Sequence, residues 1–229
     1  MAAIRTIIFM AIFYGLTIPW VVAALVGAVL GERPMHNVIY AWVRFHRWCA
    51  RAVLGIRVKI EGEIPDGQYL FAAKHQAMFE TLDFLNLLDT PAPVLKKELT
   101  SIPGWGWLSI QYGGISVDRS GGAKTMRAML KRTREILATG RSIVIFPEGT
   151  RVAPGEAPPL QAGFAGLYKM FDLPVVPIAI ESGHVWPRDS WIKRPGVVTY
   201  RFFEPIPTGL PREEIETRVY RLINDLETG

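Results

Sequence analysis

The chain of 229 residues contains a single cysteine, Cys49, so no disulfide can form within it and an oxidising compartment gains no support. Its four histidines do not combine with this cysteine at spacings typical of zinc sites, since His46-x-x-Cys49 is half a site without a second half. The Gly-x-Ser-x-Gly pattern of a serine nucleophile is also missing. We therefore expect neither a metal centre nor a nucleophilic serine.

Charge is absent from residues 7–30. As a helix, at about 1.5 Å per residue, this run would extend about 36 Å, which exceeds the roughly 30 Å of a hydrocarbon core. It is longer than the apolar region of most cleaved signal peptides, so we expect a retained membrane anchor. Pro19 lies within the run and can kink a helix. The sequence leaves open one tilted span or a bent element that enters a single leaflet.

The two flanks of this run differ in charge. Only Arg5 and the amino terminus precede it, whereas the basic residues that follow it are Arg33, Arg44, Arg47, Arg51, Arg57 and Lys59. The positive-inside tendency then predicts that the following domain lies on the cytoplasmic face of the membrane, which in a bacterium is the inner face of the inner membrane. Residues 36–54 mix tryptophans with arginines, as helices in the headgroup layer do. The alternative is a helix packed on the core.

Basic residues exceed acidic ones by 26 to 21, which gives a net charge of +5 and a preference for anionic partners. Nucleic acid, an anionic membrane and phosphorylated substrates all fit such a charge. The sequence contains no zinc finger, basic zipper or RNP-like string, and a hydrophobic anchor argues against a nucleic-acid partner. We therefore expect a membrane, a phosphorylated substrate or both.

From about residue 57 the chain alternates short apolar strands with helical stretches. The expected strands are 58–61, 69–73, 93–96, 114–117, 142–146, 175–180 and 197–203. The clearest expected helices are 123–138 and 212–226. This alternation predicts an α/β domain, in which a sheet is flanked by helices, over residues 56–229. Residues 1–55 would form the N-terminal membrane anchor and an interfacial helix.

His75 follows the predicted strand 69–73, and Glu80 follows His75 by five residues. A helical pattern begins at Phe79, so His75 would lie in the turn before a helix and Glu80 in its first turn. A carboxylate there can hold one ring nitrogen while the other accepts a proton, as in the base-and-orienter half of a catalytic triad. Asp83 lies three residues beyond Glu80 and is an alternative partner for the histidine.

A second string directly follows the predicted strand 142–146, and α/β sheets bind ligands at the carboxyl ends of their strands. It consists of Phe146, Pro147, Glu148, Gly149, Thr150 and Arg151. Gly149 would let the backbone approach a ligand closely, and Arg151 can bind a phosphate through two parallel hydrogen bonds. Together the two strings resemble the glycerolipid acyltransferases, most closely those that acylate 1-acylglycerol-3-phosphate.

This resemblance implies that His75 is the general base and Glu80 its partner, although the family usually has aspartate at position 80. It also implies that residues from Glu148 to Arg151 line the acceptor site, with Arg151 on the phosphate. Two looser matches suggest further substrate contacts from Arg119, Lys96 and Lys97. No metal or organic cofactor is implied. We expect this to be the catalytic domain, residues 56–229.

The sequence therefore predicts a membrane-bound enzyme of phospholipid biosynthesis. It would move an acyl chain from acyl-CoA or acyl carrier protein to the free hydroxyl of 1-acylglycerol-3-phosphate, giving phosphatidic acid. The lysophospholipid, the acyl donor and the bilayer are the expected partners. Three alternatives remain: an acyltransferase for another lysolipid such as lyso-ornithine lipid, a non-catalytic lipid-binding protein at the membrane surface, and a hydrolase that uses water in place of the acceptor.

Overall fold

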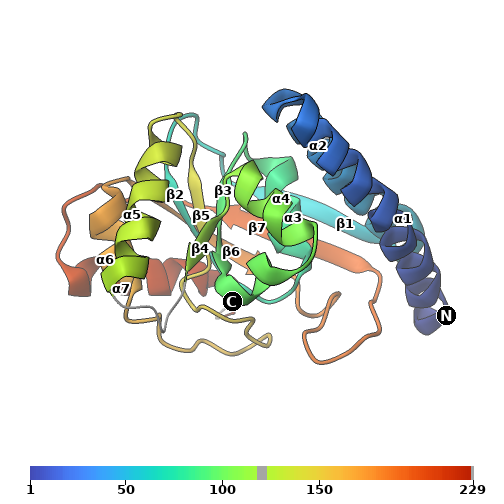
Figure 1. The fold of residues 1–229 in the computed structure, drawn as a ribbon. Helices are drawn as coiled ribbons and strands as arrows, with labels where there is room; N and C mark the ends of the chain where they lie inside the picture. The colour runs from blue at the N-terminus through green and yellow to red at the C-terminus, as the bar shows by residue number, and fades with distance from the viewer. Residues whose placement is uncertain (118–122, 228–229) are drawn as a thin grey trace.

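The computed structural model describes residues 1–117 and 123–227. Within them seven strands form one sheet in the order β1-β7-β6-β2-β5-β3-β4 (Figure 1). The strands are β1 (Ile56–Glu61), β2 (Leu70–Ala73), β3 (Ala92–Lys96), β4 (Ile115–Val117), β5 (Ile143–Ile145), β6 (Val175–Glu181) and β7 (Gly196–Phe202). Each overlaps a range predicted from the sequence, and the α/β class is confirmed.

The direction of the strands decides which loops can meet. Every neighbouring pair is parallel except β6 and β7, which are antiparallel. Strands β6, β2, β5, β3 and β4 therefore run the same way, and their carboxyl ends lie at one edge of the sheet. Segments that follow β2, β5 and β6 come together there, although they are far apart in the sequence.

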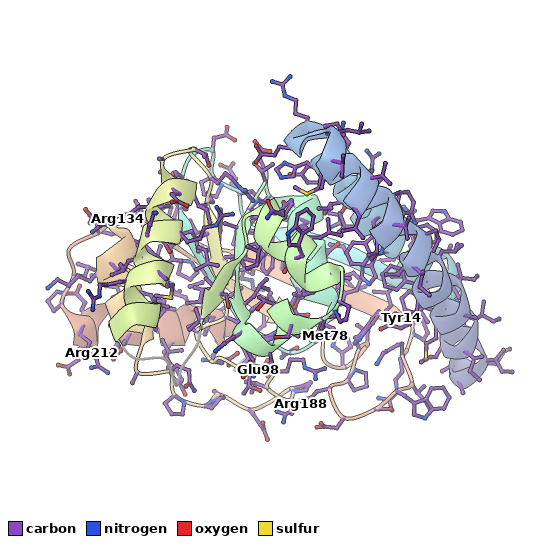
Figure 2. The ribbon with its side chains drawn as sticks, in the orientation of Figure 1. Tyr14, Met78, Glu98, Arg134, Arg188 and Arg212 are labelled. Carbon is purple, nitrogen blue, oxygen red and sulfur yellow. The ribbon has the colours of Figure 1, made fainter. Side chains whose placement is uncertain are left out.

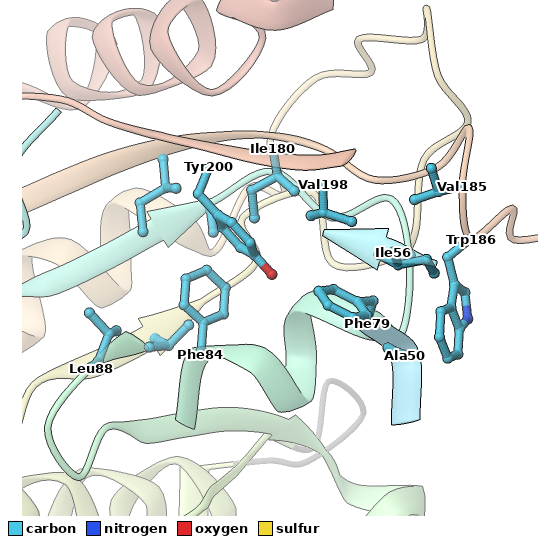
Figure 3. Packing of buried hydrophobic residues seen from close by; sticks show 14 of the residues in the cluster. Ala50, Ile56, Phe79, Phe84, Leu88, Ile180, Val185, Trp186, Val198 and Tyr200 are labelled. Atoms are coloured by element: carbon cyan, nitrogen blue, oxygen red, sulfur yellow. The ribbon is translucent and has the colours of Figure 1, made fainter. Parts of the chain in front are cut away.

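The central strands β2, β5 and β6 are buried on both faces, because their successive side chains point to opposite sides and helices cover each side. Leu70 and Ala72 join a cluster with the helices α5 (Ala123–Leu137), α6 (Phe164–Phe171) and α7 (Arg212–Ile223). Phe71 and Ala73 join the opposite cluster, which includes Phe79 and Phe84 of the helix α3 (Phe79–Leu87). Figure 3 shows these two rings packed beneath Tyr200 and Val198 of β7.

The two clearest predicted helices are confirmed with small differences at their ends. The predicted helix 123–138 corresponds to α5. The predicted helix 212–226 ends as α-helix at Ile223, and a 3-10 turn, η3 (Asp225–Glu227), follows it. This turn bends the chain back toward the sheet, which it contacts at β6.

The N-terminal segment is a single continuous helix, α1 (Ala2–Leu30), in spite of Pro19. It is long and apolar enough to cross a membrane. One of its faces packs into the molecule, where Phe9 and Phe13 are 1% and 3% exposed within the cluster that covers the sheet. The other face exposes apolar side chains along its length, namely Ile4, Ile7, Ile18, Val22, Val26 and Val29.

The helix α2 (Glu32–Cys49) packs beside α1, and both lie on the same side of the sheet (Figure 1). Its Val43, His46 and Cys49 are buried, whereas Arg44 and Trp48 are exposed. One face of α2 therefore packs on the core, and the headgroup contact predicted for the other face stays a prediction. The division of the chain at residue 55 also stays a prediction, because α1 and the sheet share one hydrophobic cluster.

Burial lowers the pKa of His46 to about 3, so this histidine is neutral at physiological pH. Its ring contacts the rings of Phe13, Phe79 and Trp186, and it serves packing rather than chemistry. Among the described residues, no group of three or more His, Cys, Asp and Glu side chains is arranged to hold a metal ion.

Because Phe13 fills the core, α1 should contribute to the stability of the whole domain. We expect Phe13→Ala to lower the free energy of unfolding by about 3 kcal/mol, as for other buried phenylalanines. Ile18→Ala, at a side chain that is 69% exposed, is the control and should change it little. Thermal unfolding of both purified variants in detergent measures this. Equal midpoints for the two variants would show that α1 is independent of the domain.

Candidate active site

Three strand ends bring the predicted base and the predicted phosphate motif together. His75 follows β2, the segment from Glu148 to Arg151 follows β5, and Ser182 follows β6. Strand β2 lies between β5 and β6 and is parallel to both. The two motifs are also joined directly, since the backbone N–H of Val152 donates to the carbonyl of His75 at 2.7 Å.

His75 and Glu80 form the predicted pair. His75 lies in the turn before α3, and its Nδ1 is 3.0 Å from Oε1 of Glu80, in the first turn of that helix. The same oxygen accepts the backbone N–H groups of Gln76 at 2.7 Å and Ala77 at 2.6 Å. The second oxygen, Oε2, accepts the hydroxyl of Ser182 at 3.0 Å. Four donors therefore hold a fully buried carboxylate in one orientation.

Asp83, the alternative partner, faces elsewhere. Its carboxylate forms a 2.6 Å ion pair with Arg47 of α2 and accepts a hydrogen bond from Asn86. Asp83 therefore links α2 to α3, and Glu80 is the carboxylate that contacts His75. The extra methylene of Glu80, relative to the family's usual aspartate, is accommodated by a turn in which residues 76 and 77 point their N–H groups at the carboxylate.

The His75 ring is also fixed by stacking. It lies against the ring of Phe146, with the centroids 3.9 Å apart and an angle of 19° between the planes. Phe146 opens the predicted phosphate motif, so this motif also positions the predicted base. With Nδ1 donating to Glu80, Nε2 is the nitrogen that can accept a proton, and 14% of the side chain is exposed to a substrate.

A buried ion pair lies behind the histidine. Lys74 Nζ is 2.8 Å from Oε1 of Glu148, and neither side chain is exposed. Glu148 Oε2 accepts the backbone N–H of His75 at 3.0 Å. Burial raises the pKa of Glu148, and the ammonium of Lys74 opposes this rise. A substrate contact by Glu148 stays a prediction, because this carboxylate faces Lys74 and the backbone of the base.

The carboxyl end of the chain completes this arrangement. Lys74 Nζ also donates to Oδ1 of Asn224 at 2.6 Å and to the carbonyl of Glu156 at 2.7 Å. Gln76 donates from its side-chain amide to Glu227, and its amide oxygen accepts the N–H groups of Ser182 and Gly183 at 2.7 and 2.8 Å. The segment around α7 and η3 thus holds the loops on both sides of His75.

Sequence reasoning missed the roles of Lys74, Gln76, Ser182 and Asn224. Lys74 offered a weak signal, because it follows four buried strand residues without a break. The other three gave none, since polar residues after a strand or a helix usually face solvent. Their function depends on partners that are more than a hundred residues away, as the separation of 102 between Ser182 and Glu80 illustrates.

The remaining predicted residues lie at the same edge of the sheet or outside the described part. Gly149 has φ of 68°, a left-handed conformation that favours glycine, and its N–H donates to the carbonyl of Phe146 at 2.9 Å. Thr150 is exposed and Arg151 is partly exposed. Lys96 ends β3 and Lys97 opens the 3-10 turn η2 (Lys97–Ser101), both exposed. Arg119 lies outside the described residues.

The Acyltransferase family model matches residues 55–181. A 1-acyl-sn-glycerol-3-phosphate acyltransferase of Pseudomonas aeruginosa is 32% identical over an alignment that covers 86% of this chain and 78% of that protein. An enzyme of the same name from Cocos nucifera is 27% identical, and this alignment covers 76% of the chain but 58% of the coconut protein. A crystal structure of the 1-acyl-sn-glycerophosphate acyltransferase PlsC from Thermotoga maritima matches the fold with a TM-score of 0.77, at 24% identity over 100% of this chain and 97% of that one.

With the histidine–carboxylate pair at the strand ends, these matches define the class: the chain belongs to the acyltransferase family. Within the family it is an enzyme of the 1-acylglycerol-3-phosphate acyltransferase type. The family, the fold and the enzyme class predicted from the two motifs are therefore confirmed. The roles of the individual site residues remain predictions.

The hydrogen-bond donors around Glu80 are placed at the reach of a glutamate. An aspartate at position 80 should therefore hold His75 less well, although the family usually has aspartate there. We expect Glu80→Asp to lower kcat by about 10²-fold, the effect of misplacing a catalytic group by about 1 Å. Glu63→Asp, at an exposed position, is the matched control. Steady-state acyl transfer measures both variants. A Glu80→Asp enzyme as fast as the wild type would show that the carboxylate position is not critical.

Removing the ammonium of Lys74 should make stability depend more strongly on the ionisation of Glu148. In Lys74→Met the pKa of Glu148 would rise further above the value of about 4.3 for a free glutamate. When a carboxyl has a higher pKa in the folded than in the unfolded protein, the free energy of unfolding falls as the pH rises between these two pKa values. We therefore expect the variant to weaken as the pH rises from about 4.3, losing about 3 kcal/mol by neutral pH.

The double variant Lys74→Met, Glu148→Gln removes both charges and is the control. Its stability relative to the wild type should show no such fall with pH. Chemical denaturation at a series of pH values measures the three proteins. A fall of the same size in the double variant would assign the pH dependence to another group.

Proposed function

We propose that this acyltransferase works at a membrane surface and transfers an acyl chain from a thioester, acyl-CoA or acyl carrier protein, to 1-acylglycerol-3-phosphate. The observation that carries this proposal is the buried Glu80 carboxylate, which holds His75 Nδ1 at 3.0 Å directly beside the arginine-bearing turn. A base next to a phosphate-binding group suits an acceptor that carries its hydroxyl close to a phosphate. The products are phosphatidic acid and a free thiol.

In this reaction the acceptor supplies the nucleophile. His75 Nε2 takes the proton of the free hydroxyl as its oxygen attacks the carbonyl carbon of the thioester. Glu80 stabilises the imidazolium that forms, and its three other donors keep it aligned with Nδ1. When the carbon–sulfur bond breaks, the imidazolium returns its proton to the departing sulfur. The protein contributes orientation and proton transfer, and no covalent acyl-enzyme is required.

An apolar pocket suits the acyl chains. It lies between α1, α2, α3 and the helix α4 (Trp105–Tyr112). The side chains that line it are mainly aromatic and aliphatic, including Trp20, Trp42, Leu82, Leu85, Trp105 and Leu108. Leu82 and Leu85 of α3 line one wall of the pocket, so the helix that carries Glu80 also forms part of the pocket. This position supports a fatty acyl substrate.

The exposed apolar face of α1 supports attachment to a bilayer. Its opposite face is packed into the domain through Phe9 and Phe13, so α1 cannot leave the domain to cross the membrane alone. We therefore favour insertion into one leaflet over a full span. The basic residues that follow α1 support a location of the domain on the cytoplasmic side of the membrane.

His75→Ala should abolish transfer while the fold is retained, because the ring is at the surface of the site. We expect the rate of acyl transfer to fall by about 10³-fold, the usual contribution of a general base. His184→Ala, at an exposed histidine, is the matched control. The assay uses purified protein with acyl-CoA or acyl carrier protein as donor and with lysophosphatidate or lyso-ornithine lipid as acceptor.

Each alternative has its own outcome in this assay. Transfer to lyso-ornithine lipid alone would keep His75 and Glu80 but remove the phosphate role of Arg151. Thioester cleavage that does not depend on any lysolipid would indicate a hydrolase. Lipid binding by the wild type without turnover on any acceptor would indicate a non-catalytic membrane protein. Substantial turnover by His75→Ala would contradict its assignment as the base.

A further inference from the structure

The loop between β6 and β7, residues 182–195, begins beside the turn that carries His75. Its first residue is Ser182, which is fully buried. Figure 2 shows Met78 of that turn and Arg188 of the loop in the same region, at the lower side of the molecule. The Acyltransferase family model ends with β6, so this loop lies outside the part of the chain that the model matches.

Gln76 connects this loop to the turn. Its side-chain oxygen accepts the backbone N–H groups of Ser182 at 2.7 Å and of Gly183 at 2.8 Å. Its own backbone N–H donates to Oε1 of Glu80 at 2.7 Å, and the Ser182 hydroxyl donates to Oε2 of the same carboxylate at 3.0 Å. Gln76, Glu80 and Ser182 therefore form a closed ring of hydrogen bonds, in which each residue contacts the other two.

The orientation of the Gln76 amide is fixed at its other end. Its side-chain N–H donates to the carboxylate of Glu227 in η3, so its oxygen is the atom that faces the loop. The opposite orientation would place the N–H donors of the amide against the backbone donors of Ser182 and Gly183, which is unfavourable. Glu227 therefore selects the orientation of Gln76 in which the ring of hydrogen bonds closes.

Close packing leaves this ring little freedom to shift. A side-chain carbon added at Gly183 would lie 2.7 Å from Cγ of Pro154 and 3.4 Å from Cβ of Gln76. Pro154 belongs to the loop that follows Arg151, so the segments after β2, β5 and β6 come into contact at Gly183. Only glycine allows so close an approach of the backbone here.

The two oxygens of Glu80 have different tasks. Oε1 contacts Nδ1 of His75 at 3.0 Å, whereas Oε2 accepts the Ser182 hydroxyl. Because a carboxylate is planar, a fixed Oε2 also fixes the direction in which Oε1 faces the histidine. The carboxylate of an aspartate lies one methylene closer to the backbone, so an aspartate at position 80 would lose one of these two contacts unless the helix moved.

We propose that Ser182 is a positioning residue for acyl transfer, and that its hydroxyl is the reason why glutamate is effective at position 80. It acts through Glu80 on His75 and does not touch the substrate. Gln76 and Glu227 hold Ser182 in place. This inference rests on the proposed function, since it takes His75 to be the base, and it adds a residue that lies outside both sequence motifs.

The test compares Ser182→Ala with the wild type in steady-state acyl transfer to lysophosphatidate. We expect kcat to fall roughly tenfold, as for the loss of one hydrogen bond to a charged group, while the KM values for donor and acceptor are unchanged. Ser182→Cys keeps the size of the side chain but offers only a weak donor, so it should resemble Ser182→Ala. Ser101→Ala, at an exposed serine, is the matched control.

A double variant tests whether Ser182 acts through Glu80. In Ser182→Ala the contact that favours glutamate is already lost, so the addition of Glu80→Asp should lower kcat much less than the roughly 10²-fold expected for Glu80→Asp alone. The proton between His75 and Glu80 gives a readout that does not require turnover. Its downfield NMR signal should broaden or shift in Ser182→Ala and stay unchanged in Ser101→Ala.

Several outcomes would overturn the inference. A Ser182→Ala enzyme with the kcat of the wild type would show that the hydroxyl has no role in the reaction. A loss in Ser182→Ala that is absent from Ser182→Cys would assign the effect to packing, and effects that multiply in the double variant would show that Ser182 acts independently of Glu80. A wild type without turnover on lysophosphatidate would sink the proposed function, whereas a changed NMR signal in Ser182→Ala would still support the positioning of Glu80.

Discussion

The buried ion pair between Lys74 and Glu148 is the interaction on which the site depends. Lys74 precedes the predicted base, Glu148 belongs to the predicted phosphate motif, and the same carboxylate also holds the backbone N–H of His75. A buried pair of this kind adds little to stability compared with an apolar pair, but an unpaired member is costly. The pair therefore fixes the spacing of β2 and β5, because neither charge can leave without exposing the other to an apolar interior.

Buried hydrogen bonds also hold the predicted base, His75, through its partner Glu80. Glu80 accepts four hydrogen bonds, two of them from the backbone of its own turn, so its orientation does not depend on the substrate. Ring stacking on Phe146 fixes the histidine from the other side. A base held on two sides before the substrate binds needs little reorganisation during proton transfer. The residue at position 80 can then be glutamate, provided that its turn supplies donors at the greater reach.

The N-terminal helices belong to this arrangement and are more than an attachment. Phe9 and Phe13 lie in the cluster that covers one face of the sheet, and Thr6 holds the loop that carries Lys193. The apolar pocket is lined in part by α1 and α2. The helix whose exposed face is proposed to meet the bilayer therefore also forms a wall of the apolar pocket.

The sequence by itself determined the strands, the family and the pair of His75 and Glu80, because each is encoded by local periodicity or by residues within five positions of one another. It also predicted that each motif directly follows a strand, where α/β sheets bind their ligands. Only the tertiary structure decided that Asp83 forms an ion pair with Arg47 and that Glu148 forms one with Lys74. Contacts of this kind join segments separated by 36 residues for Arg47 and Asp83, and by 150 residues for Lys74 and Asn224. No local pattern carries such information, because the partners of a buried polar group are set by how the sheet orders its strands.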